Sequence, residues 1–120
     1  MTDEKDPNGL DPHTPGAKLD EGKVTASLMI EDFANALLSI AEVTTHGARK
    51  YTPHGWMKVP YGRERYLDAL QRHLLAYYRG EEKDLDSGLD HLSHAAWNLL
   101  AVLELHIKDK ENIYATREGV

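Results

Sequence analysis

The feature that most constrains this chain is the pattern of residues 88–108. Apolar side chains recur there at intervals of three and four, the spacing of one face of an α-helix. The opposite side carries imidazoles, a carboxylate and an amide among apolar groups, where a solvated face would carry Lys and Glu. The pattern therefore predicts a helix covered on both sides, with its polar groups paired or bound to a ligand. The expected core stripe is Leu89, Leu92, Ala96, Leu99, Leu103 and Ile107, and the polar groups opposite are Asp90, His91, His94 and Asn98.

Two further segments have helical periodicity, residues 31–50 and residues 63–79. Pro53 and Gly55 end the first, and Gly80 ends the second. Ser27 is a candidate N-cap for the first helix, and the Ser87–Asp90 spacing resembles a capping box for the third. With short connections and no strand pattern, the three helices predict an all-α antiparallel bundle, which we expect oligomerisation to complete.

The ends of the chain are polar. Residues 1–15 are rich in Asp, Gly and Pro, which predicts a disordered N-terminus that leads into an extended arm. Residues 16–110 are expected to form a single helical domain, and residues 111–120 a polar tail. A domain of this size can bury a core without disulfides.

Composition narrows the function classes. The 120 residues include no cysteine, which rules out a disulfide framework and a Cys-based zinc site. The net charge of −6 disfavours binding to nucleic acid. No apolar run approaches the roughly 20 residues of a membrane helix, and the N-terminus has no signal core. We therefore expect a cytoplasmic protein without a membrane or nucleic-acid partner.

Candidate metal ligands come from two predicted helices. Asp90 and His94 are four residues apart and can converge on one point. Glu42 could add a second carboxylate, since cations such as Mg²⁺ take oxygen ligands. His73 lies within an apolar stripe, and it is a candidate catalytic residue with His94 and Glu42. The alternatives are that Glu42 lies on a solvated face, that His73 is a core residue, and that the polar face of the third helix is a dimer seam.

Basic and aromatic residues suggest a phosphate and a base. Two lysines lie in the glycine-rich GAKLDEGK, and two cations precede an aromatic residue in GARKY. Glycines allow close backbone approach and the cations neutralise phosphate, although the P-loop motif is absent. The candidate phosphate ligands are Lys18, Lys23, Arg49, Lys50 and Arg72, and the candidate base ligands are Tyr51, Trp56 and Asn98. Tyr51 and Trp56 could equally cover the bundle core.

The ordered segments GAKLDEGK, GARKY, HGW, RHLLAYYRGE and D-x-x-SGLDHLSHAAWN resemble the phage and bacterial family of dATP/dGTP diphosphohydrolase N-terminal domains over residues 16–106. That family is similar to the MazG-type all-α pyrophosphohydrolases. The resemblance implies cleavage of dATP or dGTP to the monophosphate and pyrophosphate, with Mg²⁺ or Mn²⁺, in a homodimer or higher homo-oligomer. The predicted helices carry neither the E-E-x-x-E nor the E-x-x-D motif of MazG-type enzymes, so histidines and fewer carboxylates would stand in.

Three hypotheses follow. The first is metal-assisted hydrolysis of a purine deoxynucleoside triphosphate. The second is a protein that binds and sequesters a nucleotide or a nucleotide-derived signal without hydrolysing it. The third is an interaction module whose histidine-rich face is only a subunit contact; because a ligand that binds the native state stabilises it, this module would give no thermal shift with any nucleotide.

Overall fold

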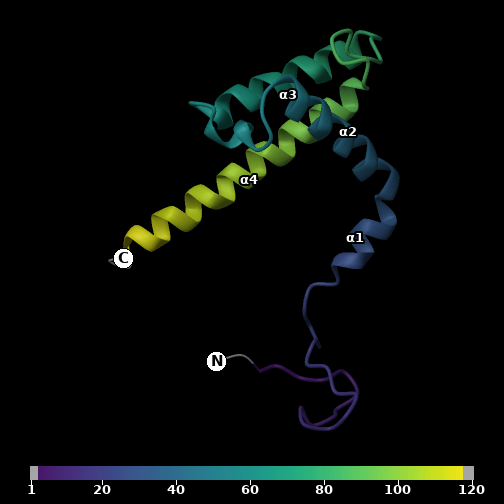
Figure 1. Ribbon diagram of the computed structural model, residues 1–120, viewed down its shortest axis with the longest axis vertical. Helices are drawn as coiled ribbons and strands as arrows, with labels where there is room; N and C mark the ends of the chain where they lie inside the picture. The colour runs from purple at the N-terminus through teal and green to yellow at the C-terminus, as the bar shows by residue number, and fades with distance from the viewer. Residues whose placement is uncertain (1–2, 118–120) are drawn as a thin grey trace. The chain divides into compact units, whose positions relative to one another are not determined.

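A computed structural model describes residues 3–117, with side chains up to residue 111. The regular secondary structure in this part of the chain consists of helices (Figure 1). Beside them there is one isolated β-bridge, between Lys83 and Asp90. The helices are α1 (Ala26–Asp32), α2 (Ala34–Lys50), the 3₁₀ helix η1 (Gly55–Lys58), α3 (Gly62–Tyr78) and α4 (His91–Arg117). The predicted all-α class is confirmed. None of the described helices has the length and apolar character needed to span a lipid bilayer.

The chain divides into two compact units, Met1–Phe33 and Ala34–Val120. Consecutive turns followed by α1 make up the described part of the first unit. The carboxylate of Asp6 is buried at 6% exposure, and it accepts the backbone N–H groups of Asn8 and Lys18, each at 2.7 Å. Through the N–H of Lys18, the carboxylate holds the start of the GAKLDEGK segment next to Asp6. These turns lie in the stretch that composition predicted to be disordered. The boundary between the two compact units follows Phe33, whereas the sequence predicted that the helical domain starts after residue 15.

The helix predicted over residues 31–50 is divided at Phe33, whose φ of −115° and ψ of 25° are not helical. Ser27 lies inside α1 and is not its N-cap; Thr25 holds that position, without a side-chain cap bond. The prediction for α3 is correct to within one residue at each end. Gly80, at φ 92°, ends it where predicted.

The third predicted helix begins three residues later than expected and continues to Arg117, through most of the segment predicted as a polar tail. Ser87 and Asp90 do not form a capping box. Gly88, at φ 73°, turns the chain before the helix begins. The Ser87 hydroxyl instead accepts the N–H of Leu89 at 3.1 Å inside this turn.

In the second unit, α4 turns back along α3 as an antiparallel partner, and α2 also packs on α4 (Figure 1). The buried face of α4 is the one with small and polar residues: Ala95, Asn98 and Ala101 are 3–5% exposed. Four residues of the predicted core stripe lie outside, among them Leu92 at 47% and Leu99 at 53% exposed, and Leu89 and Ala96 are half-buried. Small side chains let neighbouring helices approach closely, which explains why this face packs inward. The prediction that the polar face is enclosed therefore holds for His91, His94 and Asn98 and is wrong for Asp90, which is exposed and precedes the helix. The prediction that the leucines of α4 form the core of the chain is wrong.

Aromatic side chains fix η1 against the helix pair. Trp56 packs edge-to-face on Trp97 of α4 and on Tyr66 of α3, with ring centroids 5.6 and 6.1 Å away. The Tyr66 hydroxyl donates to the backbone carbonyl of Trp56 at 2.7 Å. The loop between α2 and α3 is thus held by a packed aromatic cluster.

Candidate functional site

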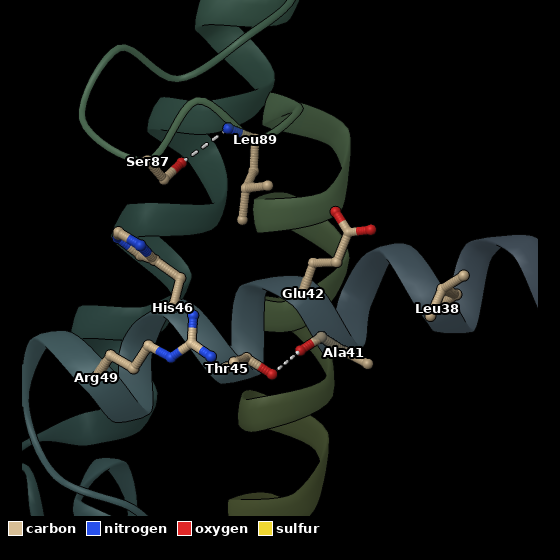
Figure 2. Close-up of a pocket in the computed structure, with 8 residues that line it drawn as sticks. All are labelled: Leu38, Ala41, Glu42, Thr45, His46, Arg49, Ser87 and Leu89. Carbon is tan, nitrogen blue, oxygen red and sulfur yellow. Dashed lines mark hydrogen bonds between the residues drawn. The ribbon is translucent and has the colours of Figure 1, made fainter.

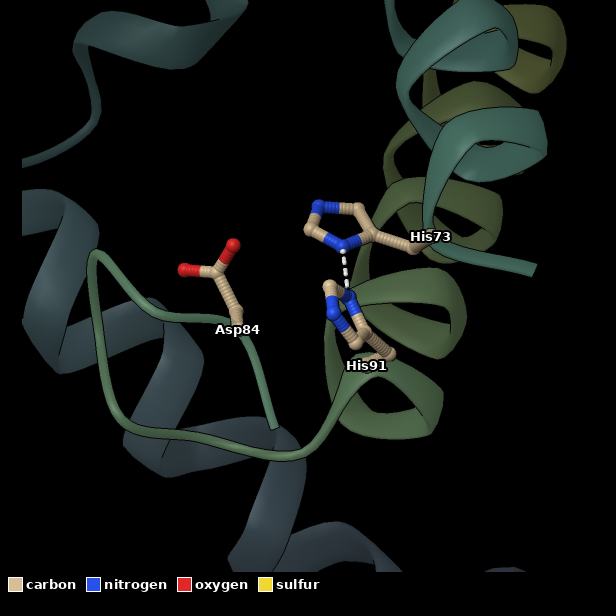
Figure 3. Close-up of side chains that lie close together, drawn as sticks. All are labelled: His73, Asp84 and His91. Atoms are coloured by element: carbon tan, nitrogen blue, oxygen red, sulfur yellow. Dashed lines mark hydrogen bonds between the residues drawn. The ribbon is translucent and has the colours of Figure 1, made fainter. Parts of the chain in front are cut away.

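Two histidines and one aspartate come together where α3, the turn before α4 and the start of α4 meet (Figure 3). The ligand atoms of His73, Asp84 and His91 all lie within 4.8 Å of one another. The Nδ1 atoms of the two imidazoles are 2.8 Å apart, and the Asp84 carboxylate faces them from the turn. Two imidazole nitrogens and one carboxylate are a donor set for a divalent cation.

Local structure places each of the three residues. His73 lies in the middle of α3, and His91 is the first residue of α4. Asp84 lies in a turn closed by its own backbone, since its N–H donates to the carbonyl of Leu89 and its carbonyl accepts the N–H of Gly88, both at 2.8 Å. The N–H of Ser87 donates to Asp84 Oδ2 at 2.9 Å and orients the carboxylate.

His94 extends the cluster by one helical turn. Its ring stacks on His73, with centroids 4.6 Å apart and an interplanar angle of 9°. Its Nε2 lies 2.6 Å from the Ser87 hydroxyl and 3.8 Å from Asp84 Oδ2. His46 of α2 meets His94 edge-on at 6.5 Å. Four imidazoles from three helices therefore form a continuous row: His46, His94, His73 and His91.

The surroundings set the charges of these groups. Burial, together with the imidazoles of His94 and His91, lowers the pKa of His73 from 6.5 to about 4. Burial also lowers the pKa of His94, against the opposing charge of Asp84. Burial alone would raise the pKa of Asp84, but its hydrogen bonds with Ser87 and the nearby imidazoles bring the net shift below the ordinary value. The lowered pKa values of His73 and His94 favour neutral imidazoles, and the lowered pKa of Asp84 favours an ionised carboxylate, which is the protonation state that a cation requires.

A pocket of about 380 Å³ adjoins the row of imidazoles (Figure 2). Ser87 lines it and also contacts His94, so the pocket meets the cluster through this hydroxyl. Glu42 and Arg49 bring one negative and one positive side chain from α2. The lining is Leu38, Ala41, Glu42, Thr45, His46, Arg49, Ser87 and Leu89.

The structure gathers a different set of side chains from the predicted metal ligands. Asp90 is exposed and lines a second pocket, of about 460 Å³, with Tyr77, Gly80, Glu82 and Leu92. Glu42 is exposed at the first pocket. Of Glu42, Asp90 and His94, only His94 contacts the cluster within the described residues, because Asp90 precedes the first turn of α4 and Asp84 occupies the position facing the imidazoles.

The predicted phosphate ligands have varied surroundings. Lys50 forms an ion pair with Asp86 at 2.7 Å, and Arg49 lines the first pocket. Arg72 is exposed on α3, next to His73. In the first unit, the Lys23 ammonium lies 3.3 Å from Glu4, and the backbone of Lys18 is bound to Asp6.

Among the predicted base ligands, Tyr51 is 74% exposed, with the Lys50 ammonium 5.5 Å from its ring centroid. Trp56 belongs to the aromatic cluster, as the alternative interpretation proposed. Asn98 is buried and donates from Nδ2 to the carbonyl of His94 at 2.8 Å. It braces the backbone of His94.

Asp84, Ser87 and His91 were not among the candidate ligands predicted from the sequence. All three lie in D-x-x-SGLDH, a segment that the family resemblance had already singled out. Membership of that segment was the one sequence feature that could have pointed to all three residues. Projection onto a helix could not, because it does not show that a turn brings Asp84 back to α3.

Fold and site together define an all-helical protein with a partly buried histidine–aspartate centre suited to a divalent cation. The chain belongs to the family described as "dATP/dGTP diphosphohydrolase, N-terminal", whose pattern matches residues 13–114. It is similar to a protein of Salmonella phage PMBT28 named "dATP/dGTP diphosphohydrolase", with 34% identity over 90 residues. The match covers 75% of this chain and 29% of that relative. No solved structure matches the chain.

Proposed function

We propose that this chain hydrolyses a purine deoxynucleoside triphosphate, dATP or dGTP, to the monophosphate and pyrophosphate. The observation that carries the proposal is the His73–Asp84–His91 cluster beside a pocket, in a chain of this family. Phosphoanhydride hydrolysis depends mostly on positioning and on neutralising the charge that develops on the phosphates. A divalent cation at the cluster fits that need.

The residues present fit such a cation. His73 and His91 would hold it through Nδ1 and Asp84 through a carboxylate oxygen. Imidazole ligands suit first-row transition metals, whereas Mg²⁺ prefers an all-oxygen shell. Of Mg²⁺ and Mn²⁺, the two ions that the resemblance implies, the donor set favours Mn²⁺. When bound, the ion would supply positive charge to phosphate oxygens and lower the pKa of a bound water.

The chain's own residues supply the remaining roles. His94 is neutral at pH 7 and lies beside Ser87 at the edge of the pocket, where its imidazole can accept a proton from an attacking water. Arg49 offers a guanidinium to phosphate oxygens. His46, on the pocket wall next to His94, can receive a hydrogen bond from the substrate.

The test separates the two candidate aspartates. Wild type, Asp84→Asn and Asp90→Asn are incubated with dATP or dGTP and Mn²⁺, and pyrophosphate is distinguished from phosphate. Asparagine at position 84 can still accept the Ser87 N–H, so the turn should fold. We expect Asp84→Asn to lose at least about 100-fold in kcat, in line with the loss of a charged group at a metal centre, and Asp90→Asn to stay within twofold. If Asp90→Asn lost activity and Asp84→Asn kept it, the metal would be assigned instead to Glu42, Asp90 and His94, the ligands predicted from the sequence.

A second candidate function is nucleotide binding without hydrolysis. The observation that favours it is that the matched segment makes up 29% of the phage relative, so that protein's activity can depend on residues outside the match. Under this hypothesis dATP or dGTP raises the melting temperature of the chain but is recovered intact. Product analysis on the same samples decides between the two functions.

We also propose that the chain works as a homo-oligomer. Leu92, Leu99, Leu103 and Ile107 form an exposed apolar stripe on α4, each 43–53% exposed. Large contiguous apolar patches on a soluble protein generally mark an interaction surface. A second copy presents the same stripe, as a two-fold symmetric contact requires.

A further inference from the structure

The contacts within the cluster account for only one of the two ring nitrogens of His91. Its Nδ1 faces His73, but its Nε2 is buried and has no hydrogen-bond partner among the described residues. The whole residue is only 5% exposed. A charged group lies near this nitrogen: Oε2 of the Glu81 carboxylate is 3.7 Å away.

The two ring nitrogens are coupled through the tautomer. A neutral imidazole carries its proton on one nitrogen and a lone pair on the other. For His91 to bind a cation through Nδ1, the proton must lie on Nε2. The negative charge of the Glu81 carboxylate, 3.7 Å from Nε2, attracts an N–H there and repels a lone pair, so it favours this tautomer.

Glu81 favours the same tautomer of His91 when no cation is bound. The 2.8 Å contact between the Nδ1 atoms requires one ring to donate and the other to accept. If His91 donated, its Nε2 lone pair would face the negative charge of Glu81. If His73 donates, the Nε2–H of His91 points at the carboxylate. Glu81 therefore favours the arrangement in which Nδ1 of His91 keeps its lone pair.

The fold holds Glu81 in this place by backbone contacts. Gly80 and Glu81 close α3 in a Schellman motif, with Gly80 N–H bound to Tyr77 and Glu81 N–H bound to Ala76, both at 3.0 Å. The next residue, Glu82, accepts the backbone N–H of His91 at 2.9 Å. The segment that carries Glu81 is thus tied both to the end of α3 and to the start of α4.

We propose that Glu81 is a positioning residue: its carboxylate fixes the Nε2–H tautomer of His91 and so presents Nδ1 to a divalent transition-metal cation held with His73 and Asp84. The proposal rests on the metal site of the proposed function. Carboxylates that orient a ligating histidine in this way are common around metal centres, and their loss weakens metal binding about 10–100-fold.

The experiment compares Glu81→Gln with Glu82→Gln on the full chain. The neighbouring Glu82 contributes its backbone carbonyl to His91 and makes a matched control, because its substitution leaves that carbonyl in place. The metal-free proteins are titrated with Mn²⁺ and, separately, Zn²⁺ by calorimetry. We expect Glu81→Gln to raise Kd about 10–100-fold and Glu82→Gln to stay within twofold.

A second measurement reads the tautomer directly. Long-range ¹H–¹⁵N correlation spectra of the metal-free protein should place the His91 proton on Nε2 in wild type, and Glu81→Gln should lose this preference. Glu82→Gln, measured in the same way, should keep the proton on Nε2 and so controls for a change in folding. If wild type binds Mn²⁺ and Glu81→Gln binds it equally well, the positioning role is overturned while the metal site stands. If wild type binds neither ion, the metal site itself fails, and a wild-type His91 with its proton on Nδ1 overturns the role of Glu81 independently.

Discussion

The ammonium of Lys50 lies 2.7 Å from the carboxylate of Asp86 and joins the last turn of α2 to the turn that carries Asp84. His46 reaches the same carboxylate at 3.9 Å. Each partner of the pair changes the pKa of the other: Asp86 raises the pKa of Lys50, and Lys50 lowers the pKa of Asp86. The residue predicted to bind phosphate thus has a partner beside the cluster.

This pair gives a first prediction. If Lys50 acts by holding the turn, Lys50→Met and Asp86→Asn should raise the KM for dATP to a similar degree, and the double variant should be no worse than either single one. Because exposed ion pairs contribute little to stability, the melting temperatures should change by only about 1–2 °C. A KM raised by Lys50→Met and lowered by Asp86→Asn would show instead that Lys50 is a phosphate ligand that Asp86 restrains.

The second prediction concerns pH. Since the pKa of His73 falls from 6.5 to about 4 on folding, the unfolded chain binds a proton in this range that the folded chain does not. Stability should therefore decrease as the pH is lowered from about 6.5 towards 4. Burial of His94 acts in the same direction.

Thermal unfolding in the presence of a chelator, measured across this pH range, checks the effect. His73→Gln should flatten the dependence, and His13→Gln, at an exposed histidine of the first unit, serves as the control. A wild-type melting temperature that stays constant from pH 7 to 4.5 would contradict the assignment.

The third prediction separates two aromatic residues that the sequence treated alike. Trp56 packs on two rings and is half-buried, so Trp56→Ala should lower the free energy of unfolding by about 3 kcal/mol, and Trp56→Phe by less. Tyr51 is 74% exposed, so Tyr51→Ala should leave stability unchanged and weaken nucleotide binding if the ring stacks on a base. Urea unfolding and nucleotide titration of the three variants test both parts. Loss of affinity in a fully stable Trp56→Phe variant would return Trp56 to the base site.

The fourth prediction concerns the leucine stripe of α4. Leu99→Glu and Leu103→Glu place charges on an exposed apolar face, so they should lower the molar mass measured by light scattering without unfolding the monomer. Glu104→Gln, an exposed change on the same helix, should leave the mass unchanged. A wild-type chain that is monomeric at high concentration would refute self-association through this face.

Local sequence information was enough to predict the main helices. Periodicity and the glycine at position 80 located α3 to within one residue, because helix ends depend on nearby backbone hydrogen bonds. The imidazoles of His73 and His94 were singled out for a similar reason, since polar groups on a covered helix face require partners. Their presence in one site follows from the packing of α3 on α4.

The tertiary structure decided which side of α4 faces inward and which acid completes the cluster. Both faces of that helix carry apolar residues, and periodicity does not say which packs inside one chain and which remains for a partner. Asp84 lies seven residues before His91, outside any regular helix, and it reaches the imidazoles because the turn around Gly88 folds back on itself. Helical spacing relates residues on one helix, whereas contacts between a turn and two helices exist only once the chain has closed on itself.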